Sequence, residues 1–575
     1  MIPPSGLPKR ILIVDNDPGT RKAVKEVFEL RYEVHTAEGS REELLSDARR
    51  LLARHSFHLA ILDLRLWNDN DPEDWSGFDL ASEIARDYPW VSCMFLTGYG
   101  NFDVAKRALE QQIVQSITLK EKGVKELVAT VDELFAHRIK CAWDQEKKWQ
   151  GKQDWLAARR SLSDLDWGES SVDEFLDSEF HEALARLFPE ATHLHLRRIG
   201  DAPSSLSVKL GNSLLLRVTP RLGTEWLQEV VVKIGRREAV RREIDSYDRY
   251  VKNRMAGYRY ADQKAHALTA HLGGIVYALI DTDMDHWSTF KDYYQKPETT
   301  GADVNAVLDR LFDHLLSSWY SNATTEHYNL WQEYGQALDL ERRLRALDWG
   351  DEPTLRFPGL SRPLPNPLPW LARYSDNSDM LASQHIIHGD LHSRNIFVGD
   401  DQGVWLIDFE RTGPGHAVRD FVELETDIKF GLTELDSAEL PLFFKLECAL
   451  LSHSRDQWWH GAVRAPESVR RDPRMRRAFS AIAELRRLAA NQSRYPDFRD
   501  YYWGLLLHTL AMATLGPISK QARSRCKLSA ALICDRLGDG QHVPNSWPPR
   551  TRLAPRRKGP VRPRRHRKNQ GAAEK

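Results

Sequence analysis

Five short strand-like runs, each followed by a helical pattern, fill the first 139 residues. The runs lie at residues 11–14, 32–36, 58–62, 91–96 and 115–119. The first of them, Ile-Leu-Ile-Val, is continuously apolar, which suits a buried parallel strand. The segments between the runs have apolar residues at helical spacing, as in helices that cover a sheet. Five strand–helix units predict an α/β fold with a doubly wound, five-stranded parallel sheet over residues 1–139.

Polar residues stand directly after four of these predicted strands. Asp15 and Asn16 follow the first, Asp63 the third, Thr97 the fourth and Lys120 the fifth. The carboxyl ends of parallel strands meet at one edge of the sheet, where such folds carry their sites. Carboxylates and a lysine gathered there are costly unless they bind a cation and an anion. The pattern therefore predicts a binding site at this edge.

The pattern over residues 9–138 resembles the receiver domain of response regulators. The resemblance implies that Asp63 accepts a phosphoryl group from an upstream sensor histidine kinase, that Thr97 contacts this group and that Lys120 pairs with it. It also implies that Asp15 and Asp63 bind Mg²⁺, with Asn16 in the second position of the family's acidic pair.

Three positions depart from the receiver pattern: Asn16 stands where the family has a second Asp, Glu121 follows Lys120 in place of a Pro, and Ile117 stands where many receivers have a switch aromatic. The loop from Trp67 to Ser76 is also longer than usual. The alternative to phosphorylation at Asp63 is a degenerate receiver that serves only as a docking module.

A second motif lies between residues 388 and 409. The sequence His-Gly-Asp-Leu-His-Ser-Arg-Asn ends at Asn395, and Asp408 and Phe409 follow 13 and 14 residues later. An Asp on a loop can accept the proton of an attacking hydroxyl, and an Asn and a second Asp can hold a cation against phosphates. We therefore interpret the stretch as a phosphoryl-transfer site with Asp390 as its base.

A lysine inside a β-branched strand lies upstream of this motif. Lys233 stands in Glu-Val-Val-Val-Lys-Ile-Gly, where an unpaired charge would be costly. The next predicted helix offers Glu238 and Glu243 as partners, and we expect Glu243 because it lies further inside the helix. The turn at Gly200 joins two predicted strands and either folds over nucleotide phosphates or is an ordinary hairpin turn.

Together these motifs resemble the aminoglycoside phosphotransferase/choline kinase branch of the kinase-like superfamily, across residues 191–450. The resemblance implies an α+β bilobal fold, with a small β-rich N-lobe at 191–282 and a helical C-lobe at 283–540. It implies ATP as the phosphoryl donor, a hydroxyl acceptor of unidentified nature, Asp390 as catalytic base, and Lys233 with its partner Glu243 at the nucleotide.

The same resemblance assigns the remaining residues of the site. Asn395 and Asp408 are Mg²⁺ ligands, whereas His388, His392 and Asp420 are structural. The alternative is a pseudokinase, which has the fold and binds nucleotide as a regulatory scaffold without turnover.

Two further segments flank these domains. Residues 140–190 are predicted to form a helical connector that transmits the receiver state, dimerises, or only packs on the next domain. Residues 541–575 form a tail with ten Lys and Arg and no acid between Arg550 and Lys568. Such a tail is expected to be disordered, and it either contacts nucleic acid or an acidic partner or remains solvated.

The composition sets limits on location. The chain has 575 residues, enough for several domains, and a net charge of −1, so no overall field favours nucleic acid. Its five cysteines are scattered without metal-ligand spacing, which indicates thiols in a reducing compartment. No stretch has the length and apolarity of a membrane span. We therefore expect a cytoplasmic protein.

Overall fold

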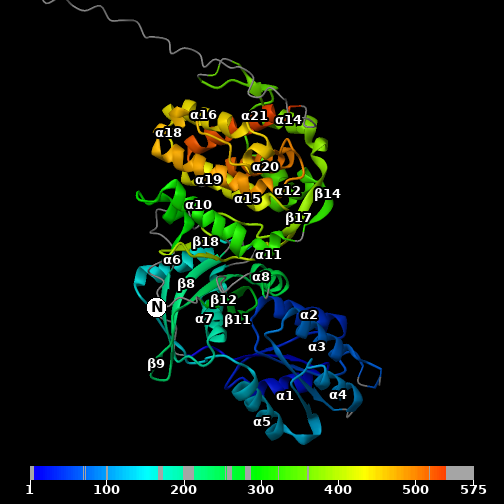
Figure 1. Cartoon of the computed structure of the whole chain (residues 1–575). Helices are drawn as coiled ribbons and strands as arrows, with labels where there is room; N and C mark the ends of the chain where they lie inside the picture. Colours follow the sequence, from blue (N-terminus) through cyan, green and yellow to red (C-terminus); the bar gives the residue numbers. More distant parts are fainter. Residues whose placement is uncertain are drawn as a thin grey trace, which may run out of the picture.

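The computed structural model describes residues 6–538 except 69, 72, 99–101, 166, 168–171, 199–212, 253, 256–261, 279–286, 322, 359, 361 and 517. The described residues form three parts: an N-terminal domain (residues 6–138), a β-rich lobe (143–278) and a helical body (287–538). The β-rich lobe lies between the other two (Figure 1). The basic tail lies outside the described residues.

The N-terminal domain is a parallel sheet with helices on both faces. Its strand order is β2-β1-β3-β4-β5, and every pairing is parallel, which confirms the predicted doubly wound sheet. Helices α2 and α3 pack on one face, and α1 and α5 pack on the other. The elements are β1 (Arg10–Val14), α1 (Pro18–Phe28), β2 (Glu33–Thr36), α2 (Glu42–Arg54), β3 (Leu59–Leu62), α3 (Ser76–Asp87), β4 (Ser92–Thr97), α4 (Phe102–Glu110), β5 (Ser116–Leu119) and α5 (Val124–Glu133).

The β-rich lobe contains a mainly antiparallel sheet of order β11-β12-β10-β8-β7-β6, with β9 paired to β8. One face is covered by α6 and α7, and α8 packs on the other. The elements are β6 (Glu146–Trp149), α6 (Lys152–Ser163), α7 (Leu176–Leu187), β7 (His193–Arg198), β8 (Ser213–Leu222), β9 (Glu225–Trp226), β10 (Val230–Arg236), α8 (Arg237–Ser246), β11 (Asp262–Leu268) and β12 (Leu272–Ala278).

The predicted connector at residues 140–190 is part of this lobe. The prediction of a wholly helical segment is wrong, because β6 pairs in parallel with β7 at the edge of the sheet. The apolar side chains of α6 and α7, including Leu162, Phe180 and Leu184, are buried against the strands. The segment therefore packs on the next domain, the alternative that the sequence left open.

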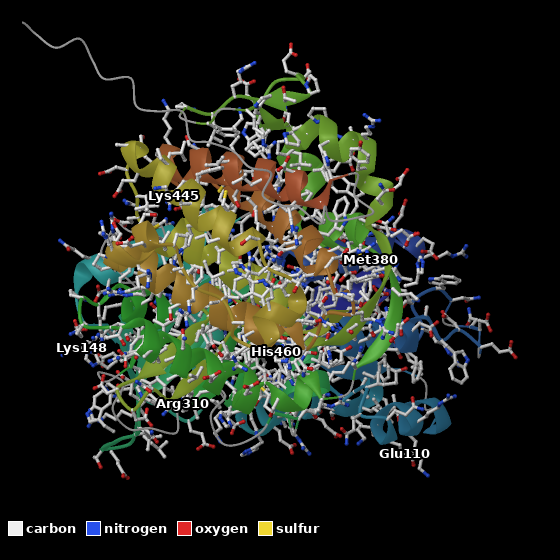
Figure 2. The ribbon with its side chains drawn as sticks, turned by 45° about the horizontal axis from the view of Figure 1, so that its top comes forward. Glu110, Lys148, Arg310, Met380, Lys445 and His460 are labelled. Atoms are coloured by element: carbon white, nitrogen blue, oxygen red, sulfur yellow. The ribbon has the colours of Figure 1, made fainter. Side chains whose placement is uncertain are left out.

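The helical body is built on one large core in which α20 is buried on all sides. Figure 2 shows Glu110 of the N-terminal domain and Lys445 of the helical body at opposite sides of the molecule. The helices are α9 (Phe290–Gln295), α10 (Gly301–Asp309), α11 (Ser317–Tyr320), α12 (Leu330–Leu338), α13 (Leu340–Leu344), α14 (Pro367–Tyr374), α15 (Arg419–Thr426), α16 (Leu440–Leu451), α17 (Arg455–Trp459), α18 (Glu467–Arg471), α19 (Pro473–Ala490), α20 (Arg499–Ala513) and α21 (Lys520–Leu537).

Small sheets in the helical body hold the predicted phosphoryl-transfer motif. Strand β17 ends directly before the motif, and β18 and β19 form the hairpin that leads from it to Asp408. The strands are β13 (Trp287–Thr289), β14 (Thr324–Asn329), β15 (Thr354–Leu355), β16 (Leu364–Pro365), β17 (Asp379–Ile387), β18 (Ile396–Gly399), β19 (Val404–Leu406) and β20 (Gly413–His416). A β-rich lobe followed by a helical body matches the predicted order, and its identity as a kinase-like fold stays a prediction.

Within the described ranges, no helix has both the length and the apolar character needed to cross a membrane.

Candidate functional site

Three charged side chains meet where β1, β3 and β5 end. Lys120 Nζ lies 2.6 Å from Asp63 Oδ2 and 2.8 Å from Asp15 Oδ2. The backbone N–H of Leu64 donates to Asp63 Oδ1 at 2.7 Å, which fixes the carboxylate. The sheet topology thus brings together three of the predicted residues, because parallel strands end at one edge.

Burial controls the charge of this cluster. It raises the pKa of Asp63 to about 6; the Asp15 carboxylate adds to the rise and the Lys120 ammonium opposes it. Burial also raises the pKa of Asp15. Two buried carboxylates around one ammonium leave an excess of negative charge, which suits a hard divalent cation.

The other predicted residues of this edge have distinct surroundings. Asn16 Oδ1 is buried and has no hydrogen-bond partner within the described ranges, so it offers an oxygen to a cation. Thr97 is buried at the end of β4, opposite Leu119 of β5. Asp17 accepts from the N–H groups of Gly19 and Thr20 and caps α1, so it points away from the cluster.

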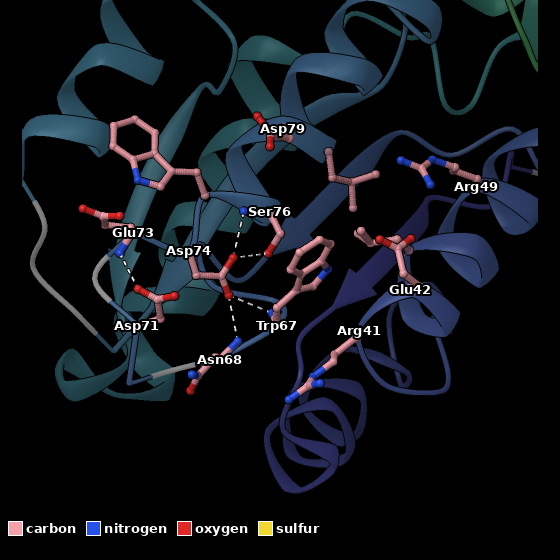
Figure 3. Close-up of a pocket in the computed structure, with 13 residues that line it drawn as sticks. Arg41, Glu42, Arg49, Trp67, Asn68, Asp71, Glu73, Asp74, Ser76 and Asp79 are labelled. Carbon is pink, nitrogen blue, oxygen red and sulfur yellow. Dashed lines mark hydrogen bonds between the residues drawn. The ribbon is translucent and has the colours of Figure 1, made fainter.

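The long loop after Asp63 has a defined shape. Asp74 Oδ2 accepts from the N–H groups of Trp67 and Asn68, both at 2.8 Å, and its Oδ1 accepts from Ser76 N at 3.0 Å (Figure 3). The loop forms one wall of an open cavity of about 690 Å³ whose other wall includes Arg41 at the start of α2. The Asp74 carboxylate therefore connects the two ends of the long loop.

A second charged cluster joins the β-rich lobe to the helical body. Lys233 Nζ lies 2.6 Å from Glu243 Oε2 and 2.7 Å from Asp408 Oδ1. Lys233 stands in β10 and is 4% exposed, while Glu243 stands on α8 and is 0% exposed. Glu238 pairs instead with Arg237, so the structure selects Glu243 between the two candidates.

The lysine remains charged in spite of its burial. Loss of water disfavours the ammonium, but the carboxylates of Asp408 and Glu243 outweigh this and raise the pKa of Lys233. Glu243 Oε1 also accepts from the Tyr277 hydroxyl and, at 3.1 Å, from Phe409 N. These bonds fix α8 to both sides of the cluster, and sequence reasoning had not predicted the role of Tyr277.

Asp420 braces the loop that carries Asp390. Its Oδ2 accepts from His388 N at 2.8 Å and from the Tyr320 hydroxyl at 2.8 Å, and its Oδ1 accepts from Gly389 N at 2.9 Å. Buried N–H groups need such partners. The contacts are those expected of the structural role predicted for Asp420.

The two histidines of the loop also make structural contacts. His388 is 0% exposed, and its Nε2 lies 3.0 Å from Ile407 O. His392 Nδ1 accepts from Arg394 N at 3.3 Å, and its Nε2 lies 3.9 Å from Asp390 Oδ2. Among the described residues, neither histidine belongs to a cluster of three or more His, Cys, Asp or Glu that could hold a metal ion.

Asn395 and Asp408 are brought to the same loop by the β18–β19 hairpin. Asn395 Nδ2 donates to Asp390 O at 2.9 Å, and Ile407 N donates to Asn395 O at 3.1 Å. Asp408 has a φ of 69°, in the left-handed region that is rare outside glycine and frequent at functional sites. No described group of three or more His, Cys, Asp or Glu could hold a metal. The two oxygens of this pair suit Mg²⁺, which takes its remaining ligands from phosphates and water.

Two charged groups beside Asp390 were missed by sequence reasoning. Arg411 Nη1 lies 3.2 Å from Asp390 Oδ1. Glu423, on α15, accepts from Leu391 N at 3.1 Å, and burial raises its pKa to about 8, with the charge of Asp390 adding to the rise. The position of Arg411 three residues after Asp408 was the available signal. Nothing in the helical spacing of Glu423 marked it.

A cavity of about 1020 Å³ opens beside these groups. Asp390, Arg411 and Glu423 line it, together with Arg343 from α13 and His508 from α20. It is large enough for a small organic molecule next to the predicted base. The predicted nucleotide-binding residue Gly200 lies outside the described residues.

The N-terminal domain docks on the β-rich lobe through α7. Glu182 Oε2 pairs with Arg10 at 3.1 Å, and its Oε1 accepts from Ser56 Oγ at 2.6 Å, lies 3.3 Å from His58 Nε2 and pairs with Arg186 at 2.8 Å. The side chain of Glu182 is 1% exposed. Arg10, Ser56 and His58 stand at the amino ends of β1 and β3, the opposite edge of the sheet from Asp63, whereas Arg186 is on α7 itself.

A second contact reaches α8. The guanidinium of Arg237 lies 5.4 Å from the ring centre of Trp90, and Arg241 donates to Arg86 O at 3.1 Å. Trp90 also packs against the apolar cluster that contains Val240 of α8. The N-terminal domain therefore contacts the helix that holds Glu243.

Comparison with known proteins identifies the N-terminal domain. The model of the response regulator receiver domain matches residues 11–132. A CheY-like receiver domain protein from Methanospirillum hungatei JF-1 is 23% identical over 22% of this chain and 94% of its own, with a TM-score of 0.20. The response regulator TrrA from Thermotoga maritima, crystallised with Mg²⁺ and BeF, is 28% identical over 22% of this chain and 98% of its own, with a TM-score of 0.18. A receiver domain implies two-component signalling and a phosphodonor such as a sensor kinase.

The remainder of the chain matches one family model. The model of ternary complex associated domain 9 matches residues 210–356 and 335–515, which together span more than half of the chain. No match to a curated protein was found. The chain therefore belongs to the ternary complex associated domain 9 family and carries a response regulator receiver domain before that domain.

Proposed function

We propose that this protein is a two-component signalling enzyme. In this proposal a sensor histidine kinase phosphorylates Asp63, and the C-terminal part transfers the γ-phosphoryl group of ATP to a hydroxyl group. The observation that carries the proposal is Lys233 held between Glu243 and Asp408, at 2.6 and 2.7 Å. Kinases hold their phosphate-binding lysine through a helix glutamate beside the metal-binding aspartate.

Each residue of the cluster has a role in such a transfer. Lys233 would bind the ATP phosphates, and Asp390 would take the proton of the attacking hydroxyl. Asn395 and Asp408 would hold Mg²⁺, which neutralises phosphate charge when bound. In the receiver domain, Asp15, Asn16 and Asp63 would hold the Mg²⁺ that supports phosphorylation of Asp63.

The contact between receiver and α8 supports control of the second site by the first. α8 carries Glu243, and its first turns contact Trp90 and Arg86 of the receiver domain. A small displacement of α8 would lengthen the 2.6 Å contact to Lys233. In this proposal, α8 is therefore the element that switches between two positions.

One observation favours a second candidate, a nucleotide-binding scaffold without turnover. Arg411 pairs with Asp390 at 3.2 Å and competes with a hydroxyl for the carboxylate. In that case the receiver would control partner binding, and Lys233 would still bind nucleotide.

Replacement of the base separates the two candidates. We expect Asp390→Asn in the full-length protein to lower ATP consumption about 100-fold or more, because a general base contributes that much. Thermal-shift titration with ATP and Mg²⁺ should show unchanged nucleotide binding. Asp379→Asn, at the exposed start of β17, is the matched control and should behave as wild type.

A wild-type protein that binds ATP but consumes it no faster than Asp390→Asn would favour the scaffold. Because the acceptor is not identified, ATP consumption is measured both with and without a mixture of small hydroxyl compounds.

A further inference from the structure

The cavity beside Asp390 contains two guanidinium groups that face the same space. Arg343 enters it from α13 and Arg411 from the loop after Asp408. Arg343 Nε is buried and has no hydrogen-bond partner among the described residues. Burial lowers the pKa of Arg343, and the charges of Arg342 and Arg411 lower it further against the effect of Asp339. Two like charges in one cavity repel each other unless an anion lies between them.

A buried histidine completes this part of the cavity. His508 is 5% exposed, and its Nε2 has no hydrogen-bond partner in the described part of the chain. Burial holds its pKa well below the usual value, and the positive charges of Arg419 and Arg411 contribute. A neutral imidazole can donate one N–H to a ligand oxygen. An unpartnered buried polar atom of this kind is available to a ligand oxygen or to a water molecule.

The carboxylates near these groups do not neutralise them. The Asp390 carboxylate already forms an ion pair with Arg411. Glu423 is largely protonated at pH 7 because its pKa is raised to about 8. Three other carboxylates line the cavity: Asp427, whose Oδ2 accepts from Ser393 N at 2.8 Å, Glu434 and Asp436. The basic residues Lys291, Arg394, Arg474 and Arg525 line it as well. The lining of the cavity therefore carries more basic than acidic side chains, which disfavours a cationic acceptor.

We infer that Arg343, Arg411 and His508 form a subsite for the carboxylate or phosphate group of a small hydroxyl compound, which is the acceptor of the transfer. The transfer to this compound rests on the proposed function. The binding of its anionic group rests only on the residues that line the cavity. In the reaction Asp390 takes the hydroxyl proton, the hydroxyl oxygen bonds to the γ-phosphorus of ATP, the bond from that phosphorus to the β–γ bridging oxygen breaks, and ADP leaves.

Calorimetric titration of the full-length protein without ATP tests the subsite. The probes are glycerol 3-phosphate, glycerate, glycerol and ethanolamine, which share a hydroxyl and differ in charge. We expect the two anions to bind and the neutral and cationic probes not to bind. The tighter of the two anions identifies the group that the subsite takes.

Variants locate the binding. Arg343→Gln should weaken anion binding about 10- to 100-fold, the effect of one charged hydrogen bond, and Arg343→Lys should restore part of it. Arg345→Gln is the matched control, since Arg345 is exposed on the same segment and pairs with Glu341 at 3.0 Å. Lys233→Met should leave anion binding unchanged, which excludes the nucleotide site as its location.

Equal behaviour of charged and neutral probes, including no binding by any, would overturn the subsite. Preferred binding of ethanolamine, or loss of anion binding in Lys233→Met but not in Arg343→Gln, would do the same. Anion binding that depends on Arg343, together with equal ATP consumption by wild type and Asp390→Asn, would confirm the subsite and refute the proposed transfer.

Discussion

Asp63 must be ionised to attack a phosphodonor, and its surroundings set the pH at which this occurs. Because burial raises its pKa to about 6, with Asp15 adding to the rise, the acid form predominates below this pH. We expect the initial rate of Asp63 phosphorylation by acetyl phosphate to rise between pH 5 and 7 and to level off above. Phosphate-affinity gels measure the rate, and a profile that is flat over this range would contradict the assignment.

The raised pKa of Glu423 is expected to make the stability of the folded protein depend on pH. Its pKa is raised from 4.5 to about 8 by burial first and by Asp390 second. A carboxyl group whose pKa is raised in the folded state binds protons more tightly there. Its stabilising contribution is complete below the unfolded-state pKa and is lost as the pH rises to the folded-state value. We therefore expect Glu423→Gln to gain thermal stability relative to wild type as the pH rises from 5 to 8.

The difference in melting temperature between Glu423→Gln and wild type, measured at each pH, isolates this group from all others. A constant difference across the range would show that Glu423 is ionised throughout.

At the scale of elements, α7 joins the receiver domain to the β-rich lobe. Glu182 pairs with Arg10 and Arg186 in a buried cluster, and Glu179 accepts from His271 N at 2.8 Å at the β11–β12 turn. Removing one member of a buried ionic cluster leaves its partners unpaired and costs about 3–5 kcal/mol. We expect Glu182→Ala to lower the free energy of unfolding by about this amount.

Glu174→Ala is the control at the same interface. Glu174 pairs with Arg54 at 3.4 Å, and both side chains are more than 60% exposed, so the expected loss is below about 1 kcal/mol. Denaturant titration measures both. Proteolysis between the receiver domain and the β-rich lobe should increase in Glu182→Ala only. Equal losses of unfolding free energy in the two variants would show that the buried ion pairs of Glu182 do not hold the two domains together.

The sequence predicted elements and local motifs better than contacts between domains. The apolar runs before Asp15 and Asp63 determine the parallel sheet, and the spacing of Asn395 and Asp408 reflects one hairpin. Both features are local, so both could be predicted from the sequence. Glu182 meets Arg10 across 172 residues of chain, and no local period encodes such a contact. For the same reason β6 was hidden in a segment that has helical composition, and the pairing of Arg411 with Asp390 required the folded loop.

At the scale of the whole molecule, the receiver domain has the proposed acceptor Asp63 and its docking contacts at opposite edges of one sheet. Asp63 follows the carboxyl end of β3, while Trp90 precedes β4 and His58 precedes β3. A four- to six-residue strand separates the two edges, roughly 15 Å. In the proposed control, a signal from Asp63 to Lys233 would therefore cross the sheet before it reaches α8.

This arrangement leads to a prediction about coupling. If control runs through α8, phosphorylation of Asp63 should change ATP consumption by the full-length protein, and the change should disappear in a Trp90→Ala, Arg237→Ala variant that is still phosphorylated. The physical reason is that this variant lacks the ring and the guanidinium that connect the receiver to α8 at 5.4 Å. Trp459→Ala, which removes an exposed tryptophan from α17 in the helical body, should keep the response.

Hydrogen exchange provides a second measurement of the same coupling. In wild type, phosphorylation should alter exchange in α8, and Asp63→Asn should abolish both this change and the change in ATP consumption. Unaltered coupling in the Trp90→Ala, Arg237→Ala variant would show that the signal does not depend on this contact, and that it reaches α8 through Arg241 and Arg86 or leaves the receiver through another face.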